Sequence, residues 1–341
     1  MATVRSSTER LVSARQYLLV GLDVGGTKIN GIAVDENLNL RSQVRIFTDT
    51  TSAGHAVQSI VSAIHQILNA TGATAEEILA IGLGIPGKVQ GGIVSHAVNL
   101  KLESFPLAST LTEIFGAPVV LENDVRAAAL GVYQRCREEM PVENLAYLSI
   151  GTGISAGVIL NGKLYRGSNG MAGEVGHSIV DPEGQRCNCG AYGCLETVAA
   201  GPAIAQQAGQ AVAAGAPTLL SDFTPLTAES VFHAAQLGDP IAQKIVRRTC
   251  AYLSRAIYGL LMAYDVDVVA LGGGVSHAGE AFLSPIMEEL TELRHRSGLA
   301  EDMLSGARIM LSPRDFNAGE WGVITLAKQK LFNSDGSKSL V

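Results

Sequence analysis

The sequence lacks both a long apolar run and a dense cluster of basic residues. No segment reaches the roughly 18–20 consecutive apolar residues of a membrane-spanning helix, so no membrane partner is expected. The chain carries 25 basic and 32 acidic residues, a formal net charge of −7. Because an acidic chain without a basic patch repels a phosphate backbone, the composition disfavours a nucleic-acid-binding protein.

Cysteine is scarce, with five residues in 341, and three of the five lie close together. This clustering indicates metal ligands and isolated thiols rather than a disulfide framework, which fits a reducing cytoplasm. His177 precedes Cys187, Cys189 and Cys194, and a tetrahedral zinc site needs such a Cys3His set. The sequence therefore predicts a zinc-binding loop with these four ligands.

Charged residues make up only 17% of the chain and apolar residues 47%, which excludes an intrinsically disordered protein. The length is sufficient for two domains. The first 17 residues contain three arginines but no uninterrupted apolar core, so a secretory signal is not expected. A flexible tail over 1–17 is favoured over a transit peptide, and a second tail is predicted over 333–341.

One pattern occurs twice along the chain. LVGLDVGGTKINGIAV, residues 19–34, and AYLSIGTGISAGVIL, residues 146–160, both read as strand, Gly/Thr turn, strand. The repeat predicts a duplicated α/β domain with a cleft between its halves. Further periodic segments predict helices over 55–70, 124–135, 201–214, 228–236, 240–263 and 318–331, and strands over 78–85, 117–121 and 266–271.

The first turn of this repeat, Asp23–Lys28, suits phosphate binding. The paired glycines Gly25-Gly26 let backbone N–H groups approach phosphate oxygens, and Thr27 adds a hydroxyl donor. Asp23 at the strand end can orient Mg²⁺ through water. The alternative is an ordinary hairpin turn, but the recurrence at Gly151-Thr152-Gly153 favours the phosphate interpretation.

The segment Gly82–Lys88, GLGIPGK, formally satisfies two nucleotide-binding patterns. A Walker loop needs Ser or Thr after the lysine, whereas this chain has Val89. Both patterns also need a helix to follow, and VQGGIV instead predicts a strand and a turn. The segment is therefore expected to shape the wall of a pocket and not to bind nucleotide.

Glu122-Asn123-Asp124 ends a predicted buried strand and opens a predicted helix. Asp124 is suited to capping that helix, which is the structural interpretation. The functional interpretation is a general base that takes a proton from a substrate hydroxyl during phosphoryl transfer. Position alone does not separate the two interpretations.

Two acids flank the predicted zinc loop. The glycine-rich loop Gly167–His177, GSNGMAGEVGH, carries Glu174 and His177, and Glu196 lies two residues after the last cysteine. Carboxylates accept hydrogen bonds from vicinal diols, so sugar hydroxyls would suit them; the alternative is a pair of surface acids. Neutral imidazole coordinates zinc through one nitrogen and keeps the other for a hydrogen bond, which gives His177 two possible contacts. Gly272-Gly273-Gly274 follows another strand and is a weaker candidate for nucleotide contact.

Taken together, these motifs resemble the ROK family of repressors and sugar kinases, in the actin-like (ribonuclease H-like) ATPase superfamily. The resemblance covers about residues 18–331. It is carried by Asp23–Lys28, by Glu122-Asn123-Asp124, by Gly151-Thr152-Gly153, and by Glu174-Val175-Gly176-His177 with Cys187-x-Cys189-Gly190-x-x-Gly193-Cys194-Leu195-Glu196.

The resemblance implies two actin-like α/β domains that flank a cleft. A smaller domain would comprise 18–122 with 318–332, and a larger one, 123–317, would carry structural zinc. Asp124 would be the catalytic base. The hexose would contact Asn99, Asn123, Asp124, Glu174, His177 and Glu196. ATP and Mg²⁺ would be held by Asp23, Gly25, Gly26, Thr27, Lys28, Thr152, Gly153, Gly272, Gly273 and Gly274.

The expected activity is ATP-dependent phosphorylation of a hexose, with glucose as the first candidate and a homodimer or homotetramer as the expected assembly. Two departures bear on this. Ser155-Ala156 stand where the family often has Gly-Gly, and Asn99-Leu100-Lys101-Leu102 lacks the aromatic residue of many glucokinases. The second departure leaves N-acetylmannosamine, N-acetylglucosamine and fructose open as substrates. A sugar-sensing regulator is the other alternative, disfavoured because only 17 residues precede the first predicted strand.

Overall fold

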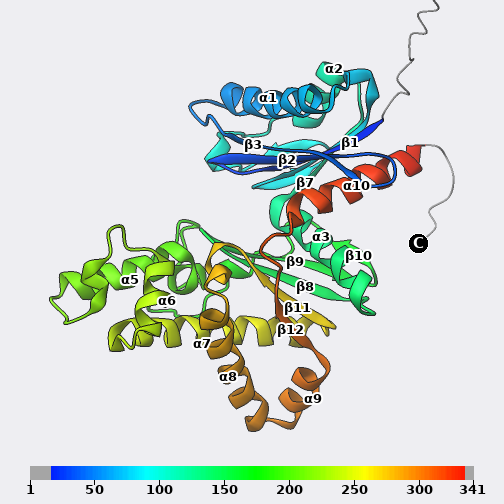
Figure 1. Ribbon diagram of the computed structural model, residues 1–341. Coiled ribbons are helices and arrows are strands. Elements are labelled where there is room, and N and C mark those ends of the chain that lie inside the picture. The colour runs from blue at the N-terminus through cyan, green and yellow to red at the C-terminus, as the bar shows by residue number, and fades with distance from the viewer. Residues whose placement is uncertain (1–16, 335–341) are drawn as a thin grey trace, which may run out of the picture.

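The computed structural model describes residues 17–334, which form two five-stranded sheets (Figure 1). The first sheet has the order β3-β2-β1-β4-β7 and the second the order β10-β9-β8-β11-β12. In each sheet the first three strands are antiparallel and the last two are parallel to the central one. This shared topology confirms the predicted duplication and the actin-like fold.

The strands of the first sheet are β1 (Leu18–Val24), β2 (Lys28–Val34), β3 (Leu40–Phe47), β4 (Ile78–Ile85) and β7 (Val119–Asn123). Those of the second sheet are β8 (Leu145–Ile150), β9 (Ile154–Leu160), β10 (Lys163–Tyr165), β11 (Val268–Gly272) and β12 (Arg308–Leu311). A separate hairpin pairs β5 (Lys88–Gln90) with β6 (Ile93–Ser95). It follows the GLGIPGK segment, so no helix stands where a nucleotide loop would need one.

Alternating side chains divide the first sheet into two buried faces. Leu18, Val20 and Leu22 of β1 pack with helices α1 (Ala53–Thr71) and α2 (Leu107–Phe115). Leu19 points the other way, toward helix α10 (Ala318–Ser334). Figure 1 shows α1 and α2 above this sheet and α10 below it. The sheet with its covering helices is called the first lobe below.

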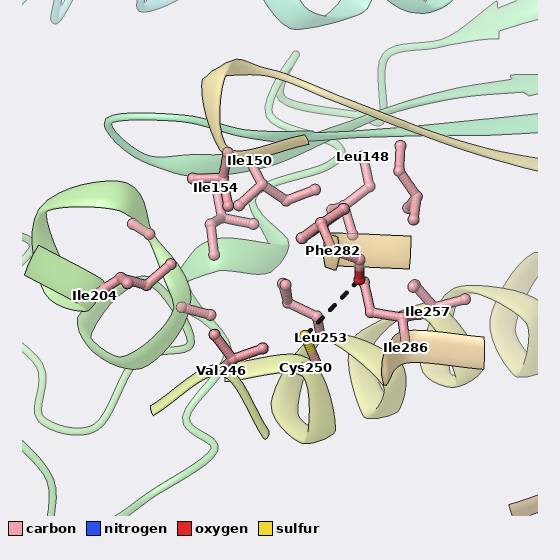
Figure 2. Close-up of a cluster of buried hydrophobic side chains, with 14 of the residues drawn as sticks. Leu148, Ile150, Ile154, Ile204, Val246, Cys250, Leu253, Ile257, Phe282 and Ile286 are labelled. Atoms are coloured by element: carbon pink, nitrogen blue, oxygen red, sulfur yellow. Dashed lines mark hydrogen bonds between the residues drawn. The ribbon is translucent and has the colours of Figure 1, made fainter. Parts of the chain in front are cut away.

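The second sheet is covered in the same way. One face packs on α5 (Gly201–Ala213), α6 (Ala228–Gln236), α7 (Pro240–Tyr264) and α8 (Glu280–Arg296). Figure 2 shows this core, in which the Cys250 thiol donates to the carbonyl of Phe282. The other face packs on α3 (Asp124–Glu139). The second lobe, as named below, is this sheet together with the helices on its first face. It also includes helices α4 (Glu196–Ala199) and α9 (Gly298–Gly306).

Short 3-10 turns complete the chain: Ala75–Glu77, Val98–Leu100, Val175–His177, Leu219–Asp222 and Gly274–Ala278. Among residues 17–334, no helix combines the length and apolarity needed to cross a bilayer. Helix α10 extends three residues beyond the predicted end at 331, and the tails predicted over 1–17 and 333–341 lie almost wholly outside the described residues. The domain limits at 122/123 and 317/318 stay a prediction.

Helices α3 and α10 join the two lobes by crossing at glycines. A Cβ atom on Gly131 would overlap the carbonyl oxygen of Ala318, and one on Gly322 would overlap that of Ala127. The two backbones therefore touch without intervening side chains. Because α3 covers the second sheet and α10 the first, this crossing fixes how the lobes meet.

Replacing Gly322 with alanine should therefore destabilise the protein by about 1–3 kcal/mol, since the added methyl group overpacks a backbone contact. The matched control is Gly259→Ala in α7, where a Cβ atom meets nothing within 4 Å. That change should stabilise the helix by about 0.5–1 kcal/mol. Urea denaturation measures both, and equal effects would contradict the tight crossing.

Candidate active site

Two aspartates lie together on the floor of the space between the lobes. Asp23 stands near the carboxyl end of β1, and Asp124 begins α3 directly after β7. The parallel strand β4 runs between β1 and β7. A Cβ atom on Gly84 would lie 3.5 Å from Asp124 Cα and 3.6 Å from Asp23 Oδ1. A side chain at this position of β4 would therefore be in van der Waals contact with both aspartates, which shows how close together they lie.

Both carboxylates line a cavity of about 270 Å³, and a third acid joins them there. Glu320, in the first turn of α10, is only 3% exposed. No ion pair or hydrogen bond joins its carboxylate to another described residue, and only its own backbone N–H and the charge of Lys28 favour the ionised form. Glu320 was not predicted from the sequence, because a single glutamate at a helix start carries no motif. Tyr147 and Phe316 also line this cavity, which we call the floor cavity.

Burial and mutual repulsion make these acids hard to ionise. Desolvation, followed by the charges of Glu320 and Asp124, raises the pKa of Asp23 to about 8. Burial also raises the pKa of Asp124, although the Val125 N–H donates to its Oδ1 at 2.9 Å. Burial raises the pKa of Glu320 as well. A bound divalent cation would relieve this repulsion, so the residues present suit Mg²⁺.

The structure corrects one sequence-based expectation at this point. The cap of α3 is Asn123 and not Asp124, because Asn123 Oδ1 accepts the Arg126 N–H at 3.2 Å. Asn123 Nδ2 donates to the carbonyl of Gly87 at 3.3 Å. The capping role is therefore filled by the neighbour, which leaves the Asp124 carboxylate available to the floor cavity. Asn123 keeps a second N–H on Nδ2 and a second lone pair on Oδ1, with which it could contact a sugar.

The turn Asp23–Lys28 lies at the edge of the first lobe. The Gly25 N–H donates to the carbonyl of Lys28 at 2.9 Å, and Thr48 Oγ1 donates to that of Gly25 at 2.8 Å. Asn99 packs on Gly26, where a Cβ atom would come within 2.9 Å of the Asn99 Cβ. Thr27 and Lys28 are exposed. The first glycine turn and one of the expected sugar-binding residues are thus in contact.

The second glycine turn borders a cavity of about 490 Å³ in the second lobe. Thr152 and Gly274 both line it, as expected of nucleotide-binding residues. Gly153 is not among the lining residues. Gly272 and Gly273 do not line this cavity either. A Cβ on Gly272 would overlap the Tyr147 hydroxyl, and Gly273 has a φ of 83°, which favours glycine. The remaining walls, which the sequence did not indicate, are Gly201, Pro202, Ala205, Val275 and the segment 226–229.

The four expected zinc ligands come together. Their ligand atoms all lie within 4.8 Å of one another. Cys187 Sγ is 3.6 Å from His177 Nδ1, and Cys189 Sγ is 3.6 Å from Cys194 Sγ. Tetrahedral ligands at the 2.3 Å zinc–sulfur distance lie about 3.8 Å apart, so this spacing fits a zinc ion. Since Nδ1 faces the cysteines, Nε2 of His177 is left for another partner.

The two acids that flank the zinc loop have different surroundings. Glu174 is exposed. Glu196 is half-buried, and its Oε2 accepts the Ile154 N–H at 3.1 Å. The same oxygen would lie 2.6 Å from a Cβ atom on Gly153. The end of the zinc loop therefore packs against the second glycine turn, a contact that the sequence did not reveal. Within 17–334, no hydrogen bond or ion pair joins Asp124 directly to either acid.

Duplicated α/β lobes, glycine turns on both sheets and clustered carboxylates between them are the features of an actin-like phosphotransferase, and the Cys3His cluster is consistent with a zinc site. Comparison with known proteins agrees. The sequence profile of the ROK family matches residues 19–330, and the chain belongs to this family. It is a ROK sugar kinase by its similarity to the relatives that follow.

The chain is 36% identical over 285 residues to a glucokinase of Halalkalibacterium halodurans, covering 81% of this chain and 86% of the relative. It is 35% identical to an N-acetylmannosamine kinase of Yersinia pseudotuberculosis, covering 76% and 83%. Among solved structures, a ROK family glucokinase from Streptomyces griseus, in complex with glucose and AMPPNP, has 32% identity and a TM-score of 0.74, covering 92% and 99%. A ROK family transcriptional regulator has 25% identity and a TM-score of 0.81, covering 93% and 79%.

The raised pKa of Asp23 gives a pH-dependent stability. A carboxyl whose pKa is higher in the folded protein contributes stability that is fully present below its unfolded pKa, about 4, and is lost as the pH rises through about 8. Without Mg²⁺, the melting temperature of Asp23→Asn relative to the unchanged protein should therefore climb between pH 4 and pH 8 and then level off. A constant difference across this range would contradict the burial of Asp23 beside the other two acids.

The zinc loop makes a second prediction. Purified protein should contain about one zinc ion per chain by elemental analysis. Cys189→Ser should lose the zinc, because it removes one of the four ligands. Cys189 is exposed, so its replacement creates no cavity in the core. Cys136→Ala, which removes a thiol outside the cluster, should retain it. Equal zinc contents in the two variants would exclude this site.

Proposed function

We propose that this protein transfers the γ-phosphoryl group of ATP to a hydroxyl of a hexose, with glucose as the first candidate and glucose 6-phosphate as its product. The proposal is carried by the position of Asp124. Asp124 is the first residue of α3, which Asn123 caps, so its carboxylate is free to face the floor cavity beside Asp23 and Glu320. The 36% identity to a glucokinase and the likeness to a structure with glucose and AMPPNP support this assignment.

In the proposed mechanism, Asp124 takes the proton of the attacking sugar hydroxyl. Burial raises its pKa, which makes the carboxylate a stronger base than an exposed aspartate. Thr152 and Gly274 border the cavity of the second lobe, which would hold the nucleotide. The backbone N–H of Gly26 would approach the transferred phosphate, since that of Gly25 already donates to the carbonyl of Lys28. Mg²⁺ near Asp23 would neutralise phosphate charge when bound.

The proposed hexose site lies between the first glycine turn and the zinc loop. Asn99, on Gly26, would contact the sugar from the first lobe. His177 would donate from Nε2 while its Nδ1 binds zinc, and Glu174 and Glu196 would accept hydrogen bonds from sugar hydroxyls. Zinc would not touch the phosphate; it would hold the loop rigid. A homodimer or homotetramer is part of the proposal, and light scattering distinguishes the two.

Two kinds of alternative remain within the family: a different sugar substrate, or a regulator without catalysis. N-acetylmannosamine is favoured by the 35% identity to a kinase of that sugar and by the missing aromatic residue after Asn99. N-acetylglucosamine and fructose are further candidates. A sugar-sensing regulator without catalysis is favoured only by the likeness to a regulator structure. It would bind a hexose without consuming ATP.

The deciding experiment combines a hexose panel with two phosphoryl donors. Zinc-loaded protein is assayed with Mg²⁺ and either ATP or polyphosphate against glucose, mannose, fructose, N-acetylglucosamine and N-acetylmannosamine. Calorimetry measures sugar binding in parallel. We expect turnover with ATP and highest kcat/KM for glucose. Binding without turnover would favour the regulator, and a preference for an N-acetylhexosamine would correct the substrate.

Asp124→Asn should lower kcat by about 100- to 10,000-fold, the usual contribution of a general base. Because asparagine keeps the shape and can still contact the sugar, the hexose dissociation constant should change little. Asp302→Asn, an exposed position on α9, serves as the control and should retain full activity. Undiminished turnover by the Asp124 variant would remove this residue as the base.

A further inference from the structure

A buried glutamate, Glu122, connects helix α3, which carries Asp124, to the glycine-rich loop of the second lobe. Glu122, the residue before Asn123, is 2% exposed and contacts two arginines. Arg126 Nε donates to Glu122 Oε1 at 2.8 Å, and Arg166 Nε donates to Glu122 Oε2 at 2.7 Å. The backbone N–H of Asn123 also donates to Oε1, at 2.9 Å. Both carboxylate oxygens are therefore occupied.

These contacts cross from one lobe to the other. Glu122 belongs to β7 of the first sheet, whereas Arg166 directly follows β10, the edge strand of the second. Arg126 lies in the first turns of α3, two residues after Asp124, and its Nη1 donates to the carbonyl of Gly170 at 3.0 Å. The pair of arginines thus holds the segment 166–170 at both ends.

The segment 166–170 leads directly to Glu174. Its continuation is anchored at Gly173, whose carbonyl accepts the Ala156 N–H at 2.7 Å and the Ser155 hydroxyl at 3.1 Å. Gly173 has φ 98°, and a side chain there would overlap the carbonyl of Ala156, so the loop has little freedom to shift. The position of Glu174 relative to Asp124 is therefore set by β9 on one side and by Glu122 on the other.

We propose that Glu122, Arg126 and Arg166 are positioning residues that set the distance between the base and the sugar-binding loop. This inference rests on the proposed function and extends it to residues that do not touch the substrate. Stability alone does not account well for the network, because burying an ion pair is often neutral or unfavourable relative to apolar packing. Arg126 Nη2 is moreover buried without a partner, which adds a further cost.

Arg166 is the residue best suited to a test. It is 49% exposed, so its replacement leaves no cavity, and the buried pair of Glu122 with Arg126 remains intact. In Arg166→Gln, the loop should shift and the hexose should lose alignment with Asp124. Since a misplacement of about 1 Å can cost 100-fold, we expect kcat/KM for the hexose to fall about tenfold or more, with KM for ATP unchanged.

Two further variants separate positioning from a general effect. Arg166→Lys should recover much of the activity, because Arg166 gives Glu122 a single hydrogen bond that an ammonium group can supply. Arg294→Gln is the matched control. It breaks an ion pair of similar length, 2.6 Å, at a similarly exposed arginine on α8, far from the cleft, and should leave kcat/KM unchanged.

The result that overturns the inference is a lower melting temperature in Arg166→Gln with kcat/KM for the hexose unchanged at 25 °C, which would make the tie purely structural. Equal losses in Arg166→Gln and Arg166→Lys would also contradict it. Failure of the proposed function is distinguishable, because the unchanged protein would then phosphorylate no hexose. Calorimetry in that case still measures whether Arg166→Gln weakens hexose binding.

Discussion

The close crossing of α3 and α10 is the constraint on which the site depends. Gly131 and Gly322 let the two backbones touch, and the first turns of the same helices carry Asp124 and Glu320. With α10 packed on β1 and β4, this contact brings both acids to the end of β1, where Asp23 lies. Larger residues at the crossing would separate the lobes and disperse the carboxylates.

The three acids of the floor cavity, Asp23, Asp124 and Glu320, then determine which ligands suit it. Three acids that are costly to ionise together suit a divalent cation, and the glycine turns of both sheets suit the phosphates such a cation accompanies. The zinc loop would depend on a metal instead: an ion bound by the Cys3His cluster would fix the loop that ends at Glu196, and that loop packs against the second glycine turn. In the proposed function, the metal, the sugar and the nucleotide would therefore contact one connected part of the structure.

The sequence predicted those features of the site that depend on residues close together in the chain. The Cys3His spacing gave the metal cluster, and the repeated Gly/Thr turn gave the duplicated sheets, because both depend on neighbouring residues. Strands β3 and β10 were missed, since they lie at sheet edges and bury few side chains. Glu320 and the contact of Glu196 with Gly153 were missed because they arise from tertiary packing. Asn123 and Asp124 could exchange the capping role, and only the observed hydrogen bond distinguishes them.

The most direct measurement is a crystal structure of the zinc-loaded protein with glucose, Mg²⁺ and a non-hydrolysable ATP analogue. We predict a sugar hydroxyl within about 2.6–3.2 Å of an Asp124 carboxylate oxygen and in line with the γ-phosphate. We also expect His177 Nε2 to contact the sugar while Nδ1 binds zinc. A hexose bound away from Asp124, or an Asp124 that only contacts backbone, would contradict the central claim.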